Sequence, residues 1–134
     1  MNTVHRSYLK LSGGRKGWVM AGMPVLKLTT IGRLSGQPRT VMLTSPFQEG
    51  DTTVLVASRG GDDIHPAWYH NLCATPQVTV TTQETKDQPM NARVANAEER
   101  ARIWPLITEK FSNYAGYQEK TDREIPLVVL TPVT

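Results

Sequence analysis

Short runs of β-branched and apolar residues, most of them joined by brief polar turns, are the feature that most constrains the fold of this 134-residue chain. Turns of this length connect antiparallel strands, because a parallel pair needs a long crossover. The runs therefore predict a mainly β fold with helices (α+β), built on an antiparallel barrel of about six strands. A chain of this length should form one domain, residues 1–134. The expected strands are 24–30, 40–47, 52–58, 77–83, 90–95 and 127–131.

Two helical stretches interrupt these strands. Pro66 suits a first helical turn and predicts a helix over residues 66–74. Asn96 followed by Glu99 matches a capping box, so a second helix should begin there. Pro105 lies inside this second helix and should kink it, because proline lacks the backbone N–H and clashes with the preceding turn.

Residues 32–39, between the first two expected strands, have the chemistry of an anion-binding loop. Their two glycines allow the backbone to turn with its N–H groups exposed, and Ser35 adds a hydroxyl donor. Arg33 and Arg39 offer planar guanidinium groups suited to phosphate or carboxylate. The same composition would equally suit a solvated basic hairpin turn.

The charge distribution favours the anion-binding interpretation. Residues 1–48 contain seven Lys or Arg and no Asp or Glu, a charge of +7, whereas the rest of the chain carries −4. A one-sided positive field suggests a polyanionic partner. The candidates are a phosphorylated cofactor, a nucleic acid and an anionic lipid surface.

A second loop of small residues with a cation, residues 58–61, leads into an aromatic segment at 65–71. Two such loops and a helix start can converge on one phosphate-bearing ligand. Trp68 and Tyr69 could stack on that ligand, although packing of at least one against the core is the more ordinary use.

Tyr114 and Tyr117 lie three residues apart in a third, shorter helical stretch, with Phe111 another three residues back. This spacing places them on one side of a helix, where packing on the barrel is the ordinary explanation. A tyrosine hydroxyl can also donate a hydrogen bond or a proton to a substrate oxygen.

Several other chemistries are excluded or disfavoured. Cys73 is the single cysteine, so no intramolecular disulfide can form, and we expect a buried thiol in a reducing cytoplasm. His65 and His70 are five residues apart and do not form the i, i+4 pair of a helical zinc site, so no metal is predicted. The weakly polar run 17–26 is too short to span a membrane. The chain has no Walker loop, dinucleotide-binding glycine motif or nucleophile elbow.

These segments, taken together and in this order, resemble the deazaflavin-dependent nitroreductase family, whose members bind coenzyme F420 on a split β-barrel. The resemblance extends from about residue 9 to residue 132. The segments that carry it are 28–33, 35–39, 57–58, 60–61, 65–72, 121–123 and 125–126.

The resemblance implies an F420-dependent oxidoreductase, in which reduced F420H2 donates a hydride to a quinone or nitroaromatic acceptor. It implies that Arg33, Ser35 and Arg39 hold the phosphate and glutamate tail of the cofactor. It also implies that Tyr114, Tyr117 and Ser58 are the catalytic residues on the substrate side. The full set of implied cofactor-binding residues is Arg33, Leu34, Ser35, Arg39, Thr40, Val41, Met42, Leu43, Thr44, Val56, Ala57, Ser58, Arg59, Ala67, Trp68, Tyr69, His70, Asn71 and Tyr114.

The chain departs from the family pattern at three positions. Leu34 stands where the family usually has lysine, which removes one cation from the tail site, and Arg59 offers partial compensation. Thr44 and Phe111 stand where some nitroimidazole-reducing members have tyrosine. Quinone reduction is therefore the better supported of the two activities.

Three alternatives remain at this point. The same barrel could bind FMN, or it could carry F420 without catalysis. A nucleic-acid-binding barrel would stack bases on strand aromatics, but the only aromatic residue in the expected strands is essentially Phe47, so we expect no nucleic-acid partner.

A cytoplasmic protein is expected. The sequence is compatible with a homodimer and with peripheral contact of the basic N-terminus, where Val4, Tyr8 and Leu11 share a helical face, with the anionic inner side of a membrane.

Overall fold

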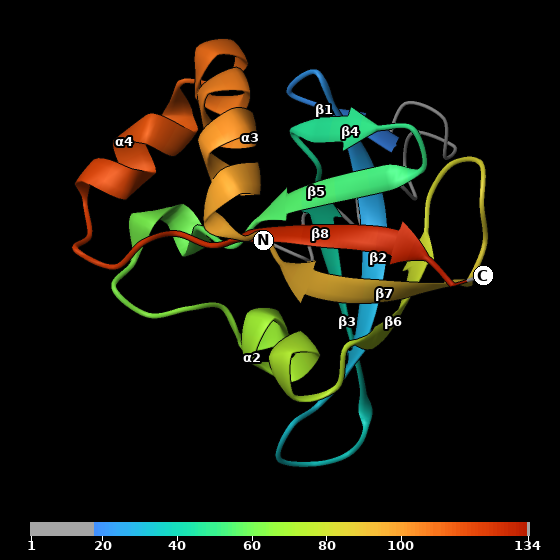
Figure 1. Ribbon diagram of the computed structural model, residues 1–134. Coiled ribbons are helices and arrows are strands. Elements are labelled where there is room, and N and C mark those ends of the chain that lie inside the picture. The colour runs from blue at the N-terminus through green and yellow to red at the C-terminus, as the bar shows by residue number, and fades with distance from the viewer. Residues whose placement is uncertain (1–17, 134) are drawn as a thin grey trace.

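The computed structural model describes residues 18–133, and within them every strand pairing is antiparallel. The strands follow the order β1-β2-β6-β7-β8-β5-β4, and β3 also pairs with β2. Figure 1 shows β2 and β3 crossing the direction of β5, β7 and β8, so that the sheet curls into a half-barrel, as predicted. The strands are β1 (Val19–Met20), β2 (Met23–Ile31), β3 (Pro38–Thr44), β4 (Phe47–Glu49), β5 (Thr52–Val56), β6 (Gln77–Thr81), β7 (Gln88–Val94) and β8 (Leu127–Pro132).

The expected strand over residues 40–47 is wrong in one respect, because the chain breaks at Ser45 and Pro46 into β3 and β4. Pro46 has no N–H to donate to a strand partner. The buried Ser45 hydroxyl instead donates to the carbonyl oxygen of Val54, 2.7 Å away. The break lets β4 turn through Gly50 and pair with β5, with Glu49 opposite Thr52.

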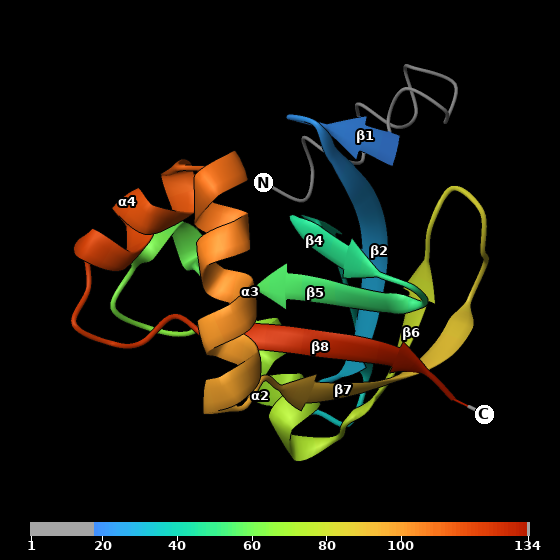
Figure 2. The ribbon, with the colours of Figure 1, turned by 45° about the horizontal axis from the view of Figure 1, so that its top comes forward.

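Strand β8 is buried on both of its faces and lies between two hydrophobic clusters. Successive side chains of a strand point to opposite sides. Val128 and Leu130 accordingly join the cluster inside the curled sheet, together with Leu26, Leu28 and Leu55. Leu127 and Val129 join a second cluster with Ile103, Ile107 and Tyr114. Figure 2 shows α3, which provides the two isoleucines, lying across the ends of β5 and β8.

The helices are α2 (Ala67–Ala74), α3 (Ala97–Lys110) and α4 (Asn113–Glu119), with a short 3₁₀ turn, η2 (Arg59–Gly61). The predicted capping box of α3 is confirmed: the Glu99 N–H donates to Asn96 Oδ1 at 2.9 Å, and the Asn96 N–H donates to Glu99 Oε1 at 3.0 Å. The helix continues through Pro105 to Lys110, so this proline does not end it.

The prediction of a buried Cys73 is wrong, because α2 turns Asn71 and Leu72 inward and leaves Cys73 exposed. Both Trp68 and Tyr69 pack against the inner cluster, as expected for at least one of them. Among residues 18–133, none of the helices is both long and apolar enough to cross a membrane. The apolar face predicted at Val4, Tyr8 and Leu11 lies outside the described residues.

Candidate active site

The β2–β3 hairpin closes on a compact loop, residues 32–37, in which one serine hydroxyl accepts two hydrogen bonds. Ile31 and Pro38 pair at its base, and the Gly32 N–H donates to the Gln37 carbonyl oxygen at 2.8 Å. Ser35 Oγ accepts from the Gln37 N–H at 3.1 Å and from Arg39 Nη2 at 3.2 Å. A Cβ atom on Gly32 would lie only 2.6 Å from Ser35 Oγ, so the loop needs glycine there.

Asn71 fastens this loop to helix α2. Its side-chain oxygen accepts the Arg33 N–H at 3.0 Å, and its Nδ2 donates to Thr30 Oγ1 at 3.1 Å. Asn71 is 7% exposed and Thr30 is 1% exposed, so their hydrogen bond is buried, whereas the bond to Arg33 is partly buried. A buried amide with both ends paired holds its neighbours in one geometry. The helix and the anion-binding loop therefore form one rigid wall.

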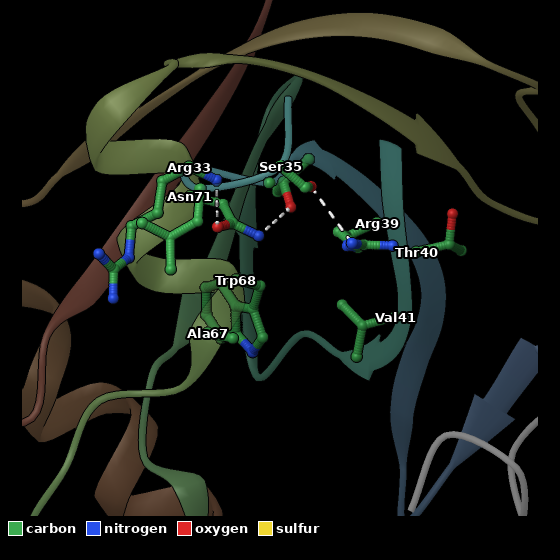
Figure 3. Close-up of a pocket in the computed structure, with 11 residues that line it drawn as sticks. Arg33, Ser35, Arg39, Thr40, Val41, Ala67, Trp68 and Asn71 are labelled. Carbon is green, nitrogen blue, oxygen red and sulfur yellow. Dashed lines mark hydrogen bonds between the residues drawn. The ribbon is translucent and has the colours of Figure 1, made fainter. Parts of the chain in front are cut away.

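A cavity of about 510 Å³ lies between this loop, β3 and α2. Figure 3 shows the Arg39 guanidinium directed toward Ser35, whereas the Arg33 side chain extends to the other side of Asn71. The two guanidinium groups therefore do not converge on one point, and Arg39 is the cation that faces the serine. The lining residues are Thr30, Gly32, Arg33, Leu34, Ser35, Arg39, Thr40, Val41, Ala67, Trp68 and Asn71.

A second cavity, of about 570 Å³, adjoins the first, because Val41 and Trp68 line both. Its lining is more apolar and includes three methionines and two tyrosines. The lining residues are Met20, Ala21, Met23, Val41, Met42, Leu43, Thr44, Val56, Ser58, Arg59, Gly60, Pro66, Trp68, Asn113, Tyr114 and Tyr117. The two cavities together offer a polar half that suits an anion and a largely apolar half that suits a ring system.

One edge of the second cavity is a loop in which three successive residues have left-handed backbone conformations. The φ angles are 45° at Arg59, 65° at Gly60 and 86° at Gly61. A Cβ atom on Gly61 would lie 2.7 Å from the Tyr117 carbonyl oxygen, so glycine is what permits the close approach of this loop to α4. Ser58 thus lines the same cavity as Tyr114 and Tyr117.

Tyr114 belongs both to this cavity and to the second hydrophobic cluster. It is 7% exposed, its ring meets the Tyr117 ring edge-on at 5.9 Å, and its hydroxyl lies 3.5 Å from Met23 Sδ. Burial raises the pKa of Tyr114 above its usual value of 10.0, and a hydrogen bond with Thr44 opposes this only in part. The hydroxyl is therefore protonated at neutral pH and can act as a donor.

Three of the residues predicted to bind the cofactor line neither cavity. Ala57 is fully buried directly after β5. Tyr69 and His70, in α2, have their rings 4.6 Å and 5.6 Å from the His65 ring between centroids. Every other residue predicted for the site lines one cavity or both.

Sequence reasoning missed several lining residues that are small or apolar and carry no chemical signal of their own. Met20 ends β1 and Ala21 lies in the β1–β2 turn, neither of which was predicted, and Met23 starts β2. Pro66 was predicted at the start of α2 but not assigned to the site, and Asn113, the first residue of α4, was not singled out. The helix boundaries could have identified these two, because a helix start that faces a cavity usually contributes to it.

Comparison with known proteins gives the family of the chain. A family model described as F420H(2)-dependent quinone reductase matches residues 1–132. An F420H(2)-dependent quinone reductase of Mycobacterium tuberculosis (strain ATCC 25618 / H37Rv) is 39% identical over 132 residues, which cover 96% of this chain and 87% of that protein.

Two solved structures are similar in both sequence and fold. One, described as an F420-H2 dependent reductase, is 40% identical with a TM-score of 0.67 and covers 80% of this chain and 93% of its own. The other, described as a domain-swapped dimer, is 35% identical with a TM-score of 0.71 and covers 96% of each chain. The resemblance found in the sequence is thereby confirmed, and the chain belongs to the F420H(2)-dependent quinone reductase family.

Proposed function

We propose that this protein reduces a quinone with reduced coenzyme F420 as the hydride donor. The observation that carries the proposal is the pair of adjoining cavities, one polar and cationic, the other largely apolar and lined by two tyrosines. F420 combines an anionic tail with a flat ring system, and a quinone is a flat apolar ring with two oxygens. The residues present fit both molecules.

The polar cavity would hold the phosphate and glutamate tail. Arg39 and Ser35 supply a cation and a hydroxyl on one side, and the loop 32–37 fixes their relative positions. Charge-assisted hydrogen bonds of this kind give both strength and orientation. Trp68 and Val41, which line both cavities, would form the floor where the tail meets the ring.

When bound, reduced F420 supplies a hydride, and a quinone that takes this hydride needs one further proton to become the hydroquinone. Tyr114 and Tyr117 would face the acceptor from α4, and Ser58 would face it from the loop before η2. A hydroxyl donor placed where negative charge develops lowers the barrier to hydride transfer. Met20, Met23 and Met42 form an adaptable apolar surface suited to a substituted ring.

The proposal is tested by titrating the purified protein with oxidised and reduced F420 and then measuring F420H2 oxidation with a panel of quinones. We expect binding of both forms and multiple turnovers with at least one quinone. NADPH should not replace F420H2, because the chain has no dinucleotide-binding glycine motif. A protein that purifies with a flavin spectrum and oxidises NADPH without F420 would instead be an FMN enzyme, and binding without turnover would make it a carrier.

We also propose that the protein is a homodimer. The support is the 35% identical solved chain described as a domain-swapped dimer, which matches 96% of this chain. Light scattering coupled to size-exclusion chromatography measures the mass directly, and a mass near 15 kDa, that of one chain, would contradict a dimer.

A further inference from the structure

Arg123 lies in the connection between α4 and β8 and donates hydrogen bonds to a loop more than fifty residues earlier in the chain. Its Nε donates to the Asp62 carbonyl oxygen at 2.8 Å, and Nη2 donates to the Ser58 carbonyl oxygen at 2.8 Å. Nη1 donates to the Ala57 carbonyl oxygen at 3.3 Å and lies 2.9 Å from His65 Nδ1. Arg123 lines neither cavity of the active site.

The segment that Arg123 holds has an unusual backbone conformation. Residues 59–61 all have positive φ, and a non-glycine residue such as Arg59 adopts this conformation only at an energetic cost. Within the segment, the Gly61 N–H donates to the Ser58 carbonyl oxygen at 2.9 Å and the Asp62 N–H to the Arg59 carbonyl oxygen at 3.2 Å. Arg123 therefore shares the Ser58 carbonyl with the turn itself.

Arg123 is also linked by hydrogen bonds to α4, the helix whose tyrosines line the second cavity. The side chain of Gln118, in α4, donates from Nε2 to the Arg123 carbonyl oxygen at 2.7 Å and accepts the Ile125 N–H at 2.9 Å. The backbone N–H of Arg123 donates to Thr121 Oγ1 at 3.3 Å. A continuous set of hydrogen bonds thus joins α4, which carries Tyr114 and Tyr117, to the loop that carries Ser58.

We propose that Arg123 is a positioning residue for the reaction, which sets the distance between the Ser58–Gly60 edge and the tyrosine edge of the acceptor cavity without touching either ligand. This inference rests on the proposed function. Only a guanidinium has the fork geometry to reach three carbonyl oxygens and an imidazole nitrogen at once, whereas lysine offers a single compact ammonium. A mutation far from the reacting atoms that displaces a reacting group by about 1 Å can reduce turnover about a hundredfold.

The test compares Arg123→Lys, which keeps the charge, with Arg102→Lys as the matched control. Arg102 also makes a two-pronged contact, to the Glu49 carboxylate at 3.1 Å for both pairs, but it lies on the exposed side of α3 away from both cavities. For Arg123→Lys we expect kcat to fall about tenfold to a hundredfold, while the Kd for F420 changes less than about threefold, because the loop that Arg123 holds does not line the tail cavity. Arg102→Lys should match the wild type in both.

A second measurement needs no cofactor. Hydrogen exchange of the Gly61 and Asp62 amides in the free protein should be about tenfold or more faster in Arg123→Lys than in the wild type, with the exchange of β8 amides unchanged. In Arg123→Ala, millimolar guanidinium should partly restore both kcat and the slow exchange, whereas equimolar sodium chloride should not.

These measurements distinguish failure of the proposed function from failure of the proposed role of Arg123. If the wild type neither binds F420 nor turns over a quinone, the proposed function fails, and the exchange data still decide whether Arg123 orders the loop. If the wild type is active and Arg123→Lys has the same kcat and the same exchange, Arg123 is not a positioning residue. Faster exchange throughout the chain, with kcat unchanged below the melting temperature, would assign Arg123 to general stability and would also overturn the proposal.

Discussion

At the scale of single residues, the polar cavity depends on one hydroxyl that arranges its neighbours. Ser35 Oγ accepts hydrogen bonds both from the loop backbone and from Arg39, so the cation is held in place before any anion arrives. Such preorganisation reduces the entropy lost on binding. Leu34, next to it, is 87% exposed and contributes no charge.

Replacing Arg39 by alanine should weaken F420 binding about tenfold or more, since a hydrogen bond to a charged group is worth about 1.5–3 kcal/mol. The dependence of Kd on salt should also become shallower, because one screened attraction is lost. Fluorescence titration at low and high salt measures both quantities. Leu34→Lys should strengthen F420 binding and make its salt dependence steeper. Equal Kd values for the wild type and both variants would show that the F420 tail does not bind in this cavity.

The contributions of the Tyr114 hydroxyl to turnover and of the Tyr114 ring to stability can be tested separately. Tyr114→Phe keeps the ring in its cluster and should lower quinone turnover about tenfold to a thousandfold if the hydroxyl donates to the acceptor oxygen. Tyr114→Ala vacates a buried site and should reduce the free energy of unfolding by about 3 kcal/mol or more. Denaturant unfolding and steady-state assays measure the two effects. Wild-type turnover in the Phe variant would leave Tyr114 with a packing role alone.

The raised pKa of Tyr114 also predicts how the free energy of unfolding changes at high pH. Its pKa is raised in the folded protein by burial, so the unfolded chain loses the proton first. The stabilising contribution is complete below pH 10 and decreases as the pH rises from there through the folded pKa. In Tyr114→Phe this part of the alkaline loss of stability should be absent.

At the scale of elements, α3 is held at its start by the capping box and by an ion pair. Arg93, in β7, forms a two-pronged contact to the Glu99 carboxylate at 2.6 Å and 2.7 Å. This hydrogen bonding, together with the Asn96 backbone N–H, lowers the pKa of Glu99 to about 2. The start of the helix is thereby fastened to the sheet on which it packs.

We expect Asn96→Ala to reduce the free energy of unfolding by about 1 kcal/mol, the usual effect of removing an N-cap side chain. Because the pKa of Glu99 is lowered on folding, its contribution is present above about pH 4.5 and is lost as the pH falls toward 2. Urea unfolding at pH 7 and at pH 3 tests both statements. Glu99→Gln should show a smaller loss of stability between these two pH values than the wild type.

The elements that could be predicted from the sequence are those whose signals are local. The β2–β3 hairpin and the capping box were recognisable because alternation, turn residues and caps act over a few positions. The break at Pro46 was missed, although a proline within a strand pattern is a known warning. Strand β1 was missed because two residues are too few to show an alternation.

The parts of the candidate site that are formed by motif side chains could be predicted from the sequence. The parts that depend on backbone hydrogen bonds could not. Loop 32–39 and the start of α2 were assigned together, and both do line the polar cavity. Asn71 and Arg123 lie in segments that carry the family resemblance, but the hydrogen bonds of Asn71 to the loop and of Arg123 to three carbonyl oxygens could not be predicted from the sequence. A carbonyl acceptor has the same chemistry at every position, so only the fold determines which carbonyls a distant side chain reaches.

At the scale of the whole molecule, the two adjoining cavities exist only when β3, α2, α4 and the loop before η2 are assembled. A ligand that fills both should therefore bind the folded protein alone and stabilise it. At a concentration of one hundred times Kd, F420 should add about 2.7 kcal/mol to the free energy of unfolding and raise Tm by roughly 10 °C. Differential scanning fluorimetry measures the shift, and its absence would contradict a site built from distant elements.

The double burial of β8 has a consequence for the kinetics of folding. Leu127 pairs with Val56, so this strand meets its partner only after a long intervening segment has been closed into a loop, an entropic step that slows folding. Val128 and Val129 are neighbours in sequence, so the entropy lost in bringing each of them to β5 is almost the same. Their side chains nevertheless pack in different clusters. Comparing the effects of Val128→Ala and Val129→Ala on folding and unfolding rates would therefore reveal whether the interior of the barrel or the layer beneath α3 consolidates first.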